Sequence, residues 1–358
     1  MKAMVVTRIG AIEQQDRPDP VPGPGEVLVT VSVTGVCRTD VKLIRVGHRD
    51  LVLPRVPGEE TVGVIAAVGP GVPAPWTLGQ RAYIYPGAWC GQCRPCRRGA
   101  ENLCESMRIM GFHRDGGFAE CLLAPVQSLI PLPEGLPDDV AVFAEPLSCC
   151  LNALELADVG RGDTLAVWGA GPAGTLLCRA ARCLGAAVTA LDPDPARRER
   201  SGGVASLPDG ESFDRCVVAV GSESAYQEAL AHLGPRGRLV VFSGLAPAAR
   251  RQAVDLNALH YHEQSLVGAY GCAFRHGVKA LQWLADGRVR VDDLVTHRLS
   301  LWDLDAALDG VEKRVGLKVL LYPGPVTGGV EKRKCEGGRS RGSSTLQNGN
   351  EQSGCGTS

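Results

Sequence analysis

The chain lacks an excess of charge, because its 38 Lys and Arg residues are matched by 39 Asp and Glu residues and its formal net charge is −1. This balance gives no support for a nucleic-acid partner or an anionic membrane surface. No apolar run reaches the roughly 18 residues that a membrane-spanning helix needs. The opening MKAMVVTRIG also lacks the apolar core and cleavage site of a secretory signal. We therefore expect a cytoplasmic protein with neither kind of partner.

The fold does not need disulfide bonds for stability, because a chain of 358 residues can bury a large core. Its length corresponds to about two domains. Cysteine is nevertheless plentiful, with 14 residues in the chain. Four of them cluster as Cys90, Cys93, Cys96 and Cys104. In a reducing compartment such clustered thiols predict metal ligands rather than disulfides.

The four clustered cysteines have the spacing C-x2-C-x2-C-x7-C. Four thiolates within so short a segment can enclose zinc in a tetrahedral shell. An iron–sulfur cluster is the rival interpretation, but the bacterial cluster run is C-x2-C-x2-C-x3-C-P, with a different last spacing. A closed shell of four thiolates has no open position, so the predicted zinc is structural.

Three regions differ in the spacing of their apolar residues. Residues 1–152 hold short β-branched runs broken by Gly and Pro, which is typical of an antiparallel β domain. Between 153 and 271, apolar strands alternate with helix-like stretches, as in a parallel sheet covered on both faces. We expect its buried strands at 165–168, 188–192, 216–220, 239–243 and 265–270.

The remaining residues divide into a structured part and a tail. Residues 272–323 predict a helix at 275–286, a strand near 295–299, a helix near 303–313 and a strand at 316–322. The tail, 324–358, has no aromatic residue and almost no apolar side chains, so it cannot offset the entropy lost on ordering. We expect the tail to be disordered.

A Gly-rich turn follows the strand predicted at 165–168; it reads Gly169, Ala170, Gly171, Pro172, Ala173 and Gly174. This G-x-G-x-x-G pattern opens a predicted helix, and Asp192 ends the next strand, which is the context of a Rossmann dinucleotide site. The pyrophosphate is expected on the helix N-terminus, with Asp192 accepting hydrogen bonds from the ribose hydroxyls. A carboxylate there repels a 2′-phosphate, so we expect NAD; Arg197 and Arg198 leave NADP as the alternative.

The segment after Asp192 is short for this fold. Only 22 positions separate Asp192 from Asp214, where a full doubly wound sheet places a helix, a third strand and another helix. We therefore expect a sheet trimmed between strands 2 and 4, on the side of the adenine.

The motifs together resemble the zinc-containing medium-chain dehydrogenase/reductase family, nearest its polyol, glucose and threonine dehydrogenase branches. The segments that carry the resemblance across 1–323 are PGPGEVLV, GVCRTD, VPGEE, the four-cysteine lobe at 87–107, AEPLSC, the Gly-rich turn, LVTHRL and GLKVLL. The resemblance implies an α/β fold in which a GroES-like β-rich catalytic domain, 1–152, is followed by a Rossmann domain, 153–271. Residues 272–323 would then return to the catalytic domain. It further implies oxidation of alcohols to carbonyls with NAD(P), in a homodimer or homotetramer.

The family's catalytic zinc maps onto Cys37, position 59 and Glu145. Position 59 should be histidine, but the segment reads Gly58-Glu59-Glu60. Carboxylate is an acceptable zinc ligand. With Cys37, Glu59 and Glu145 all ionised the ligands would carry −3, and a more negative shell makes the metal a weaker Lewis acid. A bound metal and an empty site both remain open, and Glu60 is a further candidate ligand.

The resemblance also gives roles to neighbouring residues. Thr39 matches the hydroxyl that relays the alcohol proton. Arg38 matches a position that reaches the cofactor pyrophosphate in some members. We expect four further cysteines to be buried small apolar residues: Cys149, Cys150, Cys178 and Cys183.

Three functions are compatible with these residues. The first is an NAD-dependent, zinc-type dehydrogenase of a polyol, sugar or other secondary alcohol, with a small alcohol or carbonyl as its partner. The second is a catalytically weakened member that retains the structural zinc and a binding role, which Glu59 and the short adenine side favour. The third, a zinc-independent carbonyl reductase, fits poorly because such reductases usually lack the cysteine lobe.

Overall fold

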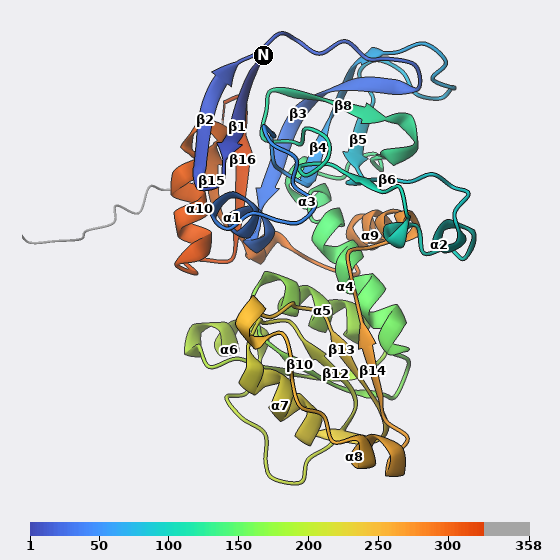
Figure 1. Ribbon diagram of the computed structural model, residues 1–358, viewed down its shortest axis with the longest axis vertical. Helices are drawn as coiled ribbons and strands as arrows, with labels where there is room; N and C mark the ends of the chain where they lie inside the picture. Colours follow the sequence, from blue (N-terminus) through green and yellow to red (C-terminus); the bar gives the residue numbers. More distant parts are fainter. Residues whose placement is uncertain (326–358) are drawn as a thin grey trace, which may run out of the picture. The chain divides into compact units, whose positions relative to one another are not determined.

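A computed structural model describes residues 1–325 of the chain (Figure 1). The predicted tail lies almost wholly outside these residues, as do Cys335 and Cys355. The described part contains two large sheets, one antiparallel in most of its pairings and one wholly parallel. This is the α/β class expected from the sequence.

The first large sheet has seven strands in the order β15-β16-β3-β4-β5-β9, with β8 paired to β3. Its strands are β3 (Glu26–Val36), β4 (Glu60–Val68), β5 (Arg81–Ile84), β8 (Cys121–Pro125), β9 (Leu129–Pro131), β15 (Val295–Ser300) and β16 (Lys318–Tyr322). The late strands β15 and β16 complete a sheet begun by the first part of the chain, as the return predicted for 272–323 requires. The boundaries proposed at 152, 271 and 323 stay predictions.

Smaller elements surround this sheet. The hairpin β1 (Lys2–Arg8) and β2 (Ala11–Asp16) forms its own two-stranded sheet, as does the pair β6 (Gly87–Ala88) and β7 (Arg108–Ile109). The α-helices of this part are α1 (Arg38–Arg45), α2 (Arg94–Arg97), α3 (Asp138–Ala141) and α10 (Leu304–Glu312).

The second large sheet is of the Rossmann type, with five parallel strands in the order β11-β10-β12-β13-β14. The strands are β10 (Thr164–Trp168), β11 (Ala187–Leu191), β12 (Phe213–Val218), β13 (Leu233–Val241) and β14 (Ser265–Gly268). The helices are α4 (Ala144–Ala157), α5 (Pro172–Cys183), α6 (Pro195–Ser201), α7 (Glu223–Ala231), α8 (Leu256–Tyr261) and α9 (Phe274–Ala285). Each strand and helix predicted between 165 and 286 overlaps one of these elements, and those predicted between 295 and 322 overlap β15, α10 and β16.

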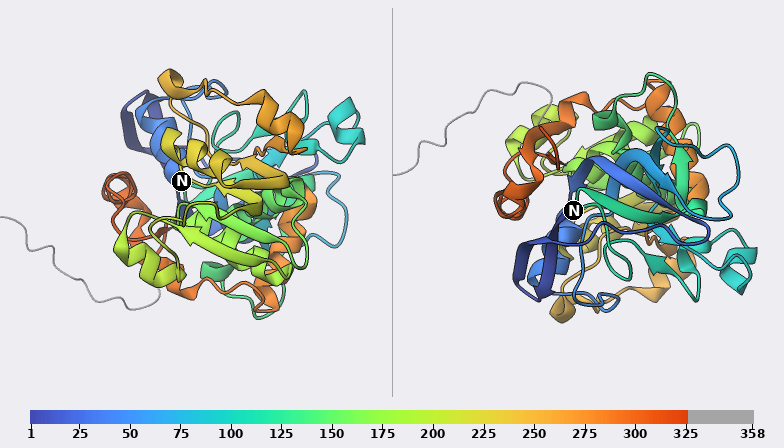
Figure 2. Two further views of the ribbon diagram at one scale, coloured as in Figure 1. Left: turned by 90° about the horizontal axis from the view of Figure 1, so that it is seen from below. Right: turned by 90° about the horizontal axis from the view of Figure 1, so that it is seen from above.

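The side chains of β10 point alternately to the two faces of the parallel sheet, and helices cover both faces. Leu165 and Val167 pack with α4 and α5, whereas Ala166 and Trp168 pack with α7. All four side chains are buried, so the strand reads as a continuous apolar run in the sequence. The two layers of helices can be followed in Figure 2.

The sheet is trimmed at the edge expected from the sequence. β11 is the terminal strand, and the position of a third strand holds only one parallel bridge, between Leu191 and Val204. Asp194 begins the short helix α6, because its side chain accepts hydrogen bonds from the amides of Ala196 and Arg197. The chain then crosses directly to β12.

The opposite edge differs from one expectation. The strand predicted as buried at 265–270 is β14, which pairs only with β13 among residues 1–325. Leu266 is 39% exposed and Tyr270 is 46% exposed. Leu266 belongs to this terminal strand, which has a neighbouring strand on one side, and Tyr270 lies just beyond the strand, so both are only partly covered.

Among the described residues, Asp138–Ala157 forms one helical stretch long and apolar enough by composition to cross a membrane. The sequence led us to expect no such stretch, and charged residues such as Glu145 interrupt its apolar run. Leu147, Leu151 and Leu154 from α4 are buried in the largest apolar cluster of the molecule. A buried core helix has the same length and apolar composition as a membrane-spanning helix. Packing within the core therefore explains why this stretch is apolar.

Candidate active site

The four-cysteine lobe lies in the segment between β6 and β7. The ligand atoms of Cys90, Cys93, Cys96 and Cys104 all lie within 4.8 Å of one another. The Cys93 sulfur is 3.3 Å from that of Cys96 and 3.8 Å from that of Cys104. These separations match the edges of a tetrahedron with metal–sulfur bonds of about 2.3 Å. The lobe therefore fits the predicted zinc.

Backbone amides prepare the lobe for anionic sulfur. The Cys93 amide donates to the Cys90 sulfur, and the amides of Cys90 and Ser106 donate to the Cys104 sulfur. Hydrogen bonds from the amides of Gln92 and Cys93 lower the pKa of the Cys90 thiol to about 6. Thiolate is the form that binds metal.

The Gly-rich turn connects β10 to α5. Gly169 has φ +100°, and a side chain on Gly174 would overlap the carbonyl of Gly169, so both positions require glycine. Gly171 caps α5 and is followed by Pro172 and Ala173 in the first helical turn. A side chain on Gly171 would meet only the Arg197 guanidinium, at 3.4 Å. Folding therefore does not require glycine at 171, whereas close approach of a pyrophosphate would.

Asp192 lies beside this turn and is 6% exposed. One carboxylate oxygen accepts from the Ala170 amide at 2.8 Å, and the other accepts from the Asp194 amide at 2.9 Å. The Arg197 guanidinium is 3.9 Å from the Asp192 carboxylate. A carboxylate and a guanidinium thus both border the place where the adenosine ribose of a dinucleotide is expected.

Cys37 directly follows β3 and caps α1. Its sulfur accepts from the Thr39 amide at 3.3 Å, and its own amide donates to Asp40 at 2.9 Å. This reciprocal arrangement is a capping box, which satisfies two backbone donors of the helix. Thr39 and Arg38 are exposed, and Arg38 Nη1 is 3.5 Å from the Glu312 carbonyl oxygen, to which it donates.

An ion pair between Glu60 and Lys318 is buried between β4 and β16. Gly35 of β3 pairs with Glu60 on one side and Leu320 on the other. Any side chain on Gly35 would overlap the Glu60 carboxylate. Glycine there lets the two charged side chains meet over the intervening strand, with side-chain exposures of 4% for Lys318 and 2% for Glu60.

Four carboxyl groups share the interior with that single ammonium. Burial, followed by the charge of Glu145, raises the pKa of Glu59 well above its usual range. Burial raises the pKa of Asp40 to about 7, and burial together with the Glu60 charge raises that of Glu145 to about 7. Burial lowers the pKa of Lys318, but the charges of Glu60 and Cys37 outweigh it and raise the pKa overall. Burial therefore opposes the charge of these acids, and protons or a further cation would balance them.

Glu145 also belongs to a group that the sequence did not predict. The ligand atoms of Glu145, Cys149 and Cys272 all lie within 4.8 Å of one another. Within residues 1–325, no group of three or more such ligands apart from this one and the lobe lies so close, and neither group includes Cys37, Glu59 or Glu60. The predicted grouping of Cys37 with positions 59 and 145 therefore stays a prediction.

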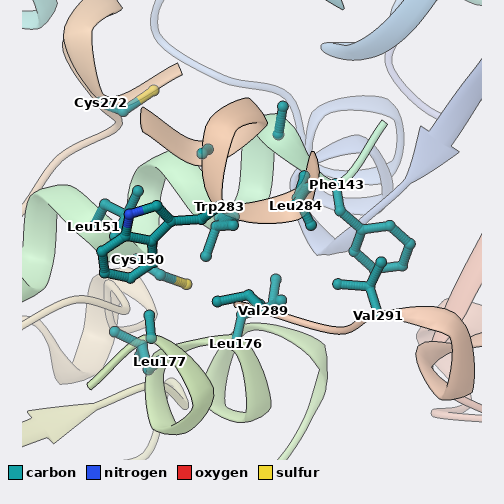
Figure 3. Packing of buried hydrophobic residues seen from close by; sticks show 14 of the residues in the cluster. Phe143, Cys150, Leu151, Leu176, Leu177, Cys272, Trp283, Leu284, Val289 and Val291 are labelled. Carbon is teal, nitrogen blue, oxygen red and sulfur yellow. The ribbon is translucent and has the colours of Figure 1, made fainter. Parts of the chain in front are cut away.

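Two expectations about cysteine were wrong. Cys149 is not simply an apolar residue, because its thiol donates to Glu145 Oε1 at 3.3 Å. Cys183 is exposed near the end of α5. Cys150 and Cys178 are buried as expected, and Figure 3 shows Cys150 among the apolar side chains of Leu151, Leu176 and Leu177.

Comparison with known proteins places this geometry in a family. Residues 23–134 match the alcohol dehydrogenase GroES-like domain. A sorbitol dehydrogenase of Halalkalibacterium halodurans is 30% identical over 345 residues, covering 90% of this chain and 99% of that protein. The chain belongs to the zinc-containing medium-chain dehydrogenase/reductase family. It is accordingly an oxidoreductase of the alcohol dehydrogenase type.

Further relatives of this family member agree in fold and length. An L-galactonate-5-dehydrogenase of Escherichia coli is 29% identical over 315 residues, covering 83% of this chain and 91% of that protein. The crystal structure of a zinc-binding dehydrogenase from Sinorhizobium meliloti, bound to NADP, is 27% identical and superposes with a TM-score of 0.83. It covers 90% of this chain and 99% of that one.

Sequence reasoning missed Lys318 and Cys272. Lys318 lies in the GLKVLL segment, which gave only a family resemblance and no sign that the ammonium is buried against Glu60. Cys272 lies more than 120 positions from Cys149 in the sequence, so no spacing pattern connects the two.

Proposed function

We propose that the chain is an NAD-dependent alcohol dehydrogenase that oxidises a polyol, a sugar or another secondary alcohol. The observation that carries this proposal is the Gly-rich turn at the start of α5 with Asp192 buried beside it. The acid-rich interior next to Cys37 supplies the other half of the site. The named relatives support the substrate class, because they include sorbitol and L-galactonate dehydrogenases.

In this proposal the acid-rich interior around Glu145 would hold a metal, which would supply Lewis-acid polarisation of the substrate oxygen. The amides at the α5 N-terminus hold the pyrophosphate, and Gly171 allows its close approach. Thr39, exposed at the start of α1, would relay the hydroxyl proton of the alcohol toward solvent by accepting it and giving up its own proton, and bound NAD would supply the acceptor for the hydride. The carbon centre is thereby oxidised by two electrons and the cofactor is reduced by two.

Asp192 supports NAD as the cofactor, because a buried carboxylate next to the ribose disfavours an additional phosphate. Arg197, 3.9 Å from it, is the group that would accept NADP instead. We propose a homodimer or homotetramer as well, since Leu266 in the terminal strand β14 and Tyr270 just beyond it are partly exposed. The location that we propose is the cytoplasm.

The test is reduction of NAD and of NADP by the purified full chain with a panel of polyols, sugar acids and secondary alcohols, followed by absorbance. We expect NADH formation with at least one polyol or sugar acid. Gly171→Ala should fold normally but bind NADH on the order of 10-fold more weakly, equivalent to about 1.4 kcal/mol. Normal NADH binding by this variant, or no turnover with any alcohol, would contradict the proposal.

A weakened family member with a binding role is the second candidate. Glu59 in the place of the expected histidine favours it, as does the absence of Cys37 from the close ligand groups of residues 1–325. This candidate predicts tight NADH binding without turnover of any alcohol in the panel. The two functions are therefore separated by the same experiment.

A further inference from the structure

Helix α4 presents three polar side chains at helical spacing toward the loop before α9. Glu145, Cys149 and Asn152 are four and three residues apart, so they lie along one face of the helix. The Asn152 amide donates to the Gly271 carbonyl at 2.9 Å. This hydrogen bond ties the loop to α4 directly next to Cys272.

A second hydrogen bond fixes the same loop from the other side. The Tyr85 hydroxyl donates to the Cys272 carbonyl at 2.6 Å, and both residues are buried. Cys272 is 4% exposed, and Figure 3 shows it in the segment preceding α9, at the border of the apolar cluster. The Asn152 hydrogen bond thus holds the loop against α4, and the buried Tyr85 hydrogen bond fixes the Cys272 backbone.

The resulting ligand atoms have separations suited to a metal. Cys149 Sγ is 3.3 Å from Glu145 Oε1, and the three ligand atoms of the group lie within 4.8 Å of one another. With zinc–sulfur bonds of about 2.3 Å and zinc–oxygen bonds of about 2.1 Å, tetrahedral geometry places sulfur and oxygen about 3.6 Å apart. The observed separations, 3.3 Å between Cys149 Sγ and Glu145 Oε1 and at most 4.8 Å within the group, lie on either side of this value.

The surroundings carry the charge that a cation would balance. Glu59 and Glu60 both lie near enough to influence Glu145 or Cys272, and the buried ammonium nearby, Lys318, is already paired with Glu60. Two sulfur ligands select a thiophilic metal such as zinc over magnesium or calcium.

We propose that Glu145, Cys149 and Cys272 bind a zinc ion through a ligand set that does not require Cys37. This set differs from the one that the family resemblance implies, which uses Cys37 and position 59. The site rests on the proposed dehydrogenase function for its chemical role, because it lies in the same acid-rich interior. Asn152 is a positioning residue that holds Cys272 against α4.

The decisive experiment counts zinc per chain in the purified full-length protein by mass spectrometry. The wild type should hold about two equivalents, one of them in the cysteine lobe. Cys149→Ala and Cys272→Ala should each retain about one. Cys150→Ala is the matched control, because Cys150 is the adjacent cysteine in the apolar cluster and should leave both equivalents in place.

A further variant separates this ligand set from that of the family. Cys37→Ala should retain about two equivalents, since the proposed set does not include it. The proposal is overturned if Cys149→Ala and Cys272→Ala keep the second zinc. It is also overturned if unreduced wild-type protein shows a Cys149–Cys272 disulfide with one zinc.

A measurement on the wild type guards against variants that fail to fold. X-ray absorption at the zinc edge should give a mean of about 3 sulfur ligands per zinc, from four in the lobe and two in the proposed site. A mean near 2.5 would indicate one sulfur in the second site, as in the family's set, and would overturn the proposal. Zinc content tests the metal site, and turnover tests the proposed function. Two zinc equivalents without NAD reduction would reject the dehydrogenase function and leave the proposed metal site supported.

Discussion

The cysteine lobe and the acid-rich interior obtain their ligands in different ways. All four lobe cysteines lie within one segment of 15 residues, 90–104. The interior draws on the end of β3, the start of β4, α4, the loop before α9 and the start of β16. A local set keeps its geometry as long as one loop keeps its spacing. A set assembled from five elements can change at one residue while the others stay in place, and here Glu59 stands where the family has histidine.

Removing the buried ammonium should produce the largest effect and would show how far the interior depends on charge balance. Lys318→Met leaves Glu60 buried without its partner, next to Asp40, Glu59 and Glu145. We expect a loss of about 3–5 kcal/mol in the free energy of unfolding, measured with urea.

The matched control is Lys313→Met, since Lys313 forms a surface pair with Asp309 and its side chain is 69% exposed. That variant should lose less than about 1 kcal/mol. Equal stability of the Lys318 and Lys313 variants would show that the buried pair does not stabilise the fold.

Removing one lobe ligand should test whether the two regions are independent. Cys93→Ala should lose the lobe zinc, because three thiolates no longer close the shell. We expect zinc to fall from about two equivalents to about one, with faster proteolysis confined to residues 90–107. Loss of both zinc ions would mean that the regions are coupled rather than separate.

Replacing the positioning residue Asn152 should have a smaller effect, confined to metal binding in the acid-rich interior. Asn152→Ala removes the hydrogen bond to the Gly271 carbonyl while leaving all three proposed ligands present. Zinc affinity of the second site should fall about 10-fold, as for other outer-shell changes. Chelator competition measures this, and an unchanged affinity would show that Cys272 does not need Asn152 to hold its place.

An acid outside both regions should give the smallest effect and provides a reference. Hydrogen bonds from the Thr164 amide and hydroxyl lower the pKa of Asp214, which joins β12 to β10. Its stabilising contribution is therefore complete above its ordinary pKa of about 3.9 and is lost as the pH falls through the lower folded value.

In Asp214→Asn the free energy of unfolding should depend less steeply on pH in this range, by less than about 1 kcal/mol in total. The zinc content should be unchanged at pH 7. A steeper loss of stability at low pH in the variant than in the wild type would reverse the assignment.

The sequence predicted those parts of the structure that depend on neighbouring residues. Strand periodicity and the Gly-rich turn located β10 and α5, and the short interval after Asp192 indicated the trimmed edge at β11. The spacing from Cys90 to Cys104 likewise predicted a set of ligands that the structure brings together.

The sequence could not reveal contacts that depend on tertiary pairing. The Glu60–Lys318 pair exists because β16 and β4 flank Gly35, which no local pattern indicates. From the sequence, Cys149 is one of several small apolar residues. Its proximity to Cys272 arises only in the folded chain, where Asn152 holds the loop of Cys272 against α4. Exposure of Leu266 followed from the terminal position of β14 and not from its composition.

The central claim is that the interior of this dehydrogenase still binds a metal although Glu59 replaces the family's histidine. Zinc per chain, compared between wild type and Glu59→His, tests that claim most directly. We predict about two equivalents in both proteins. About one equivalent in the wild type, rising to about two in Glu59→His, would show that Glu59 has emptied the site and would contradict the account.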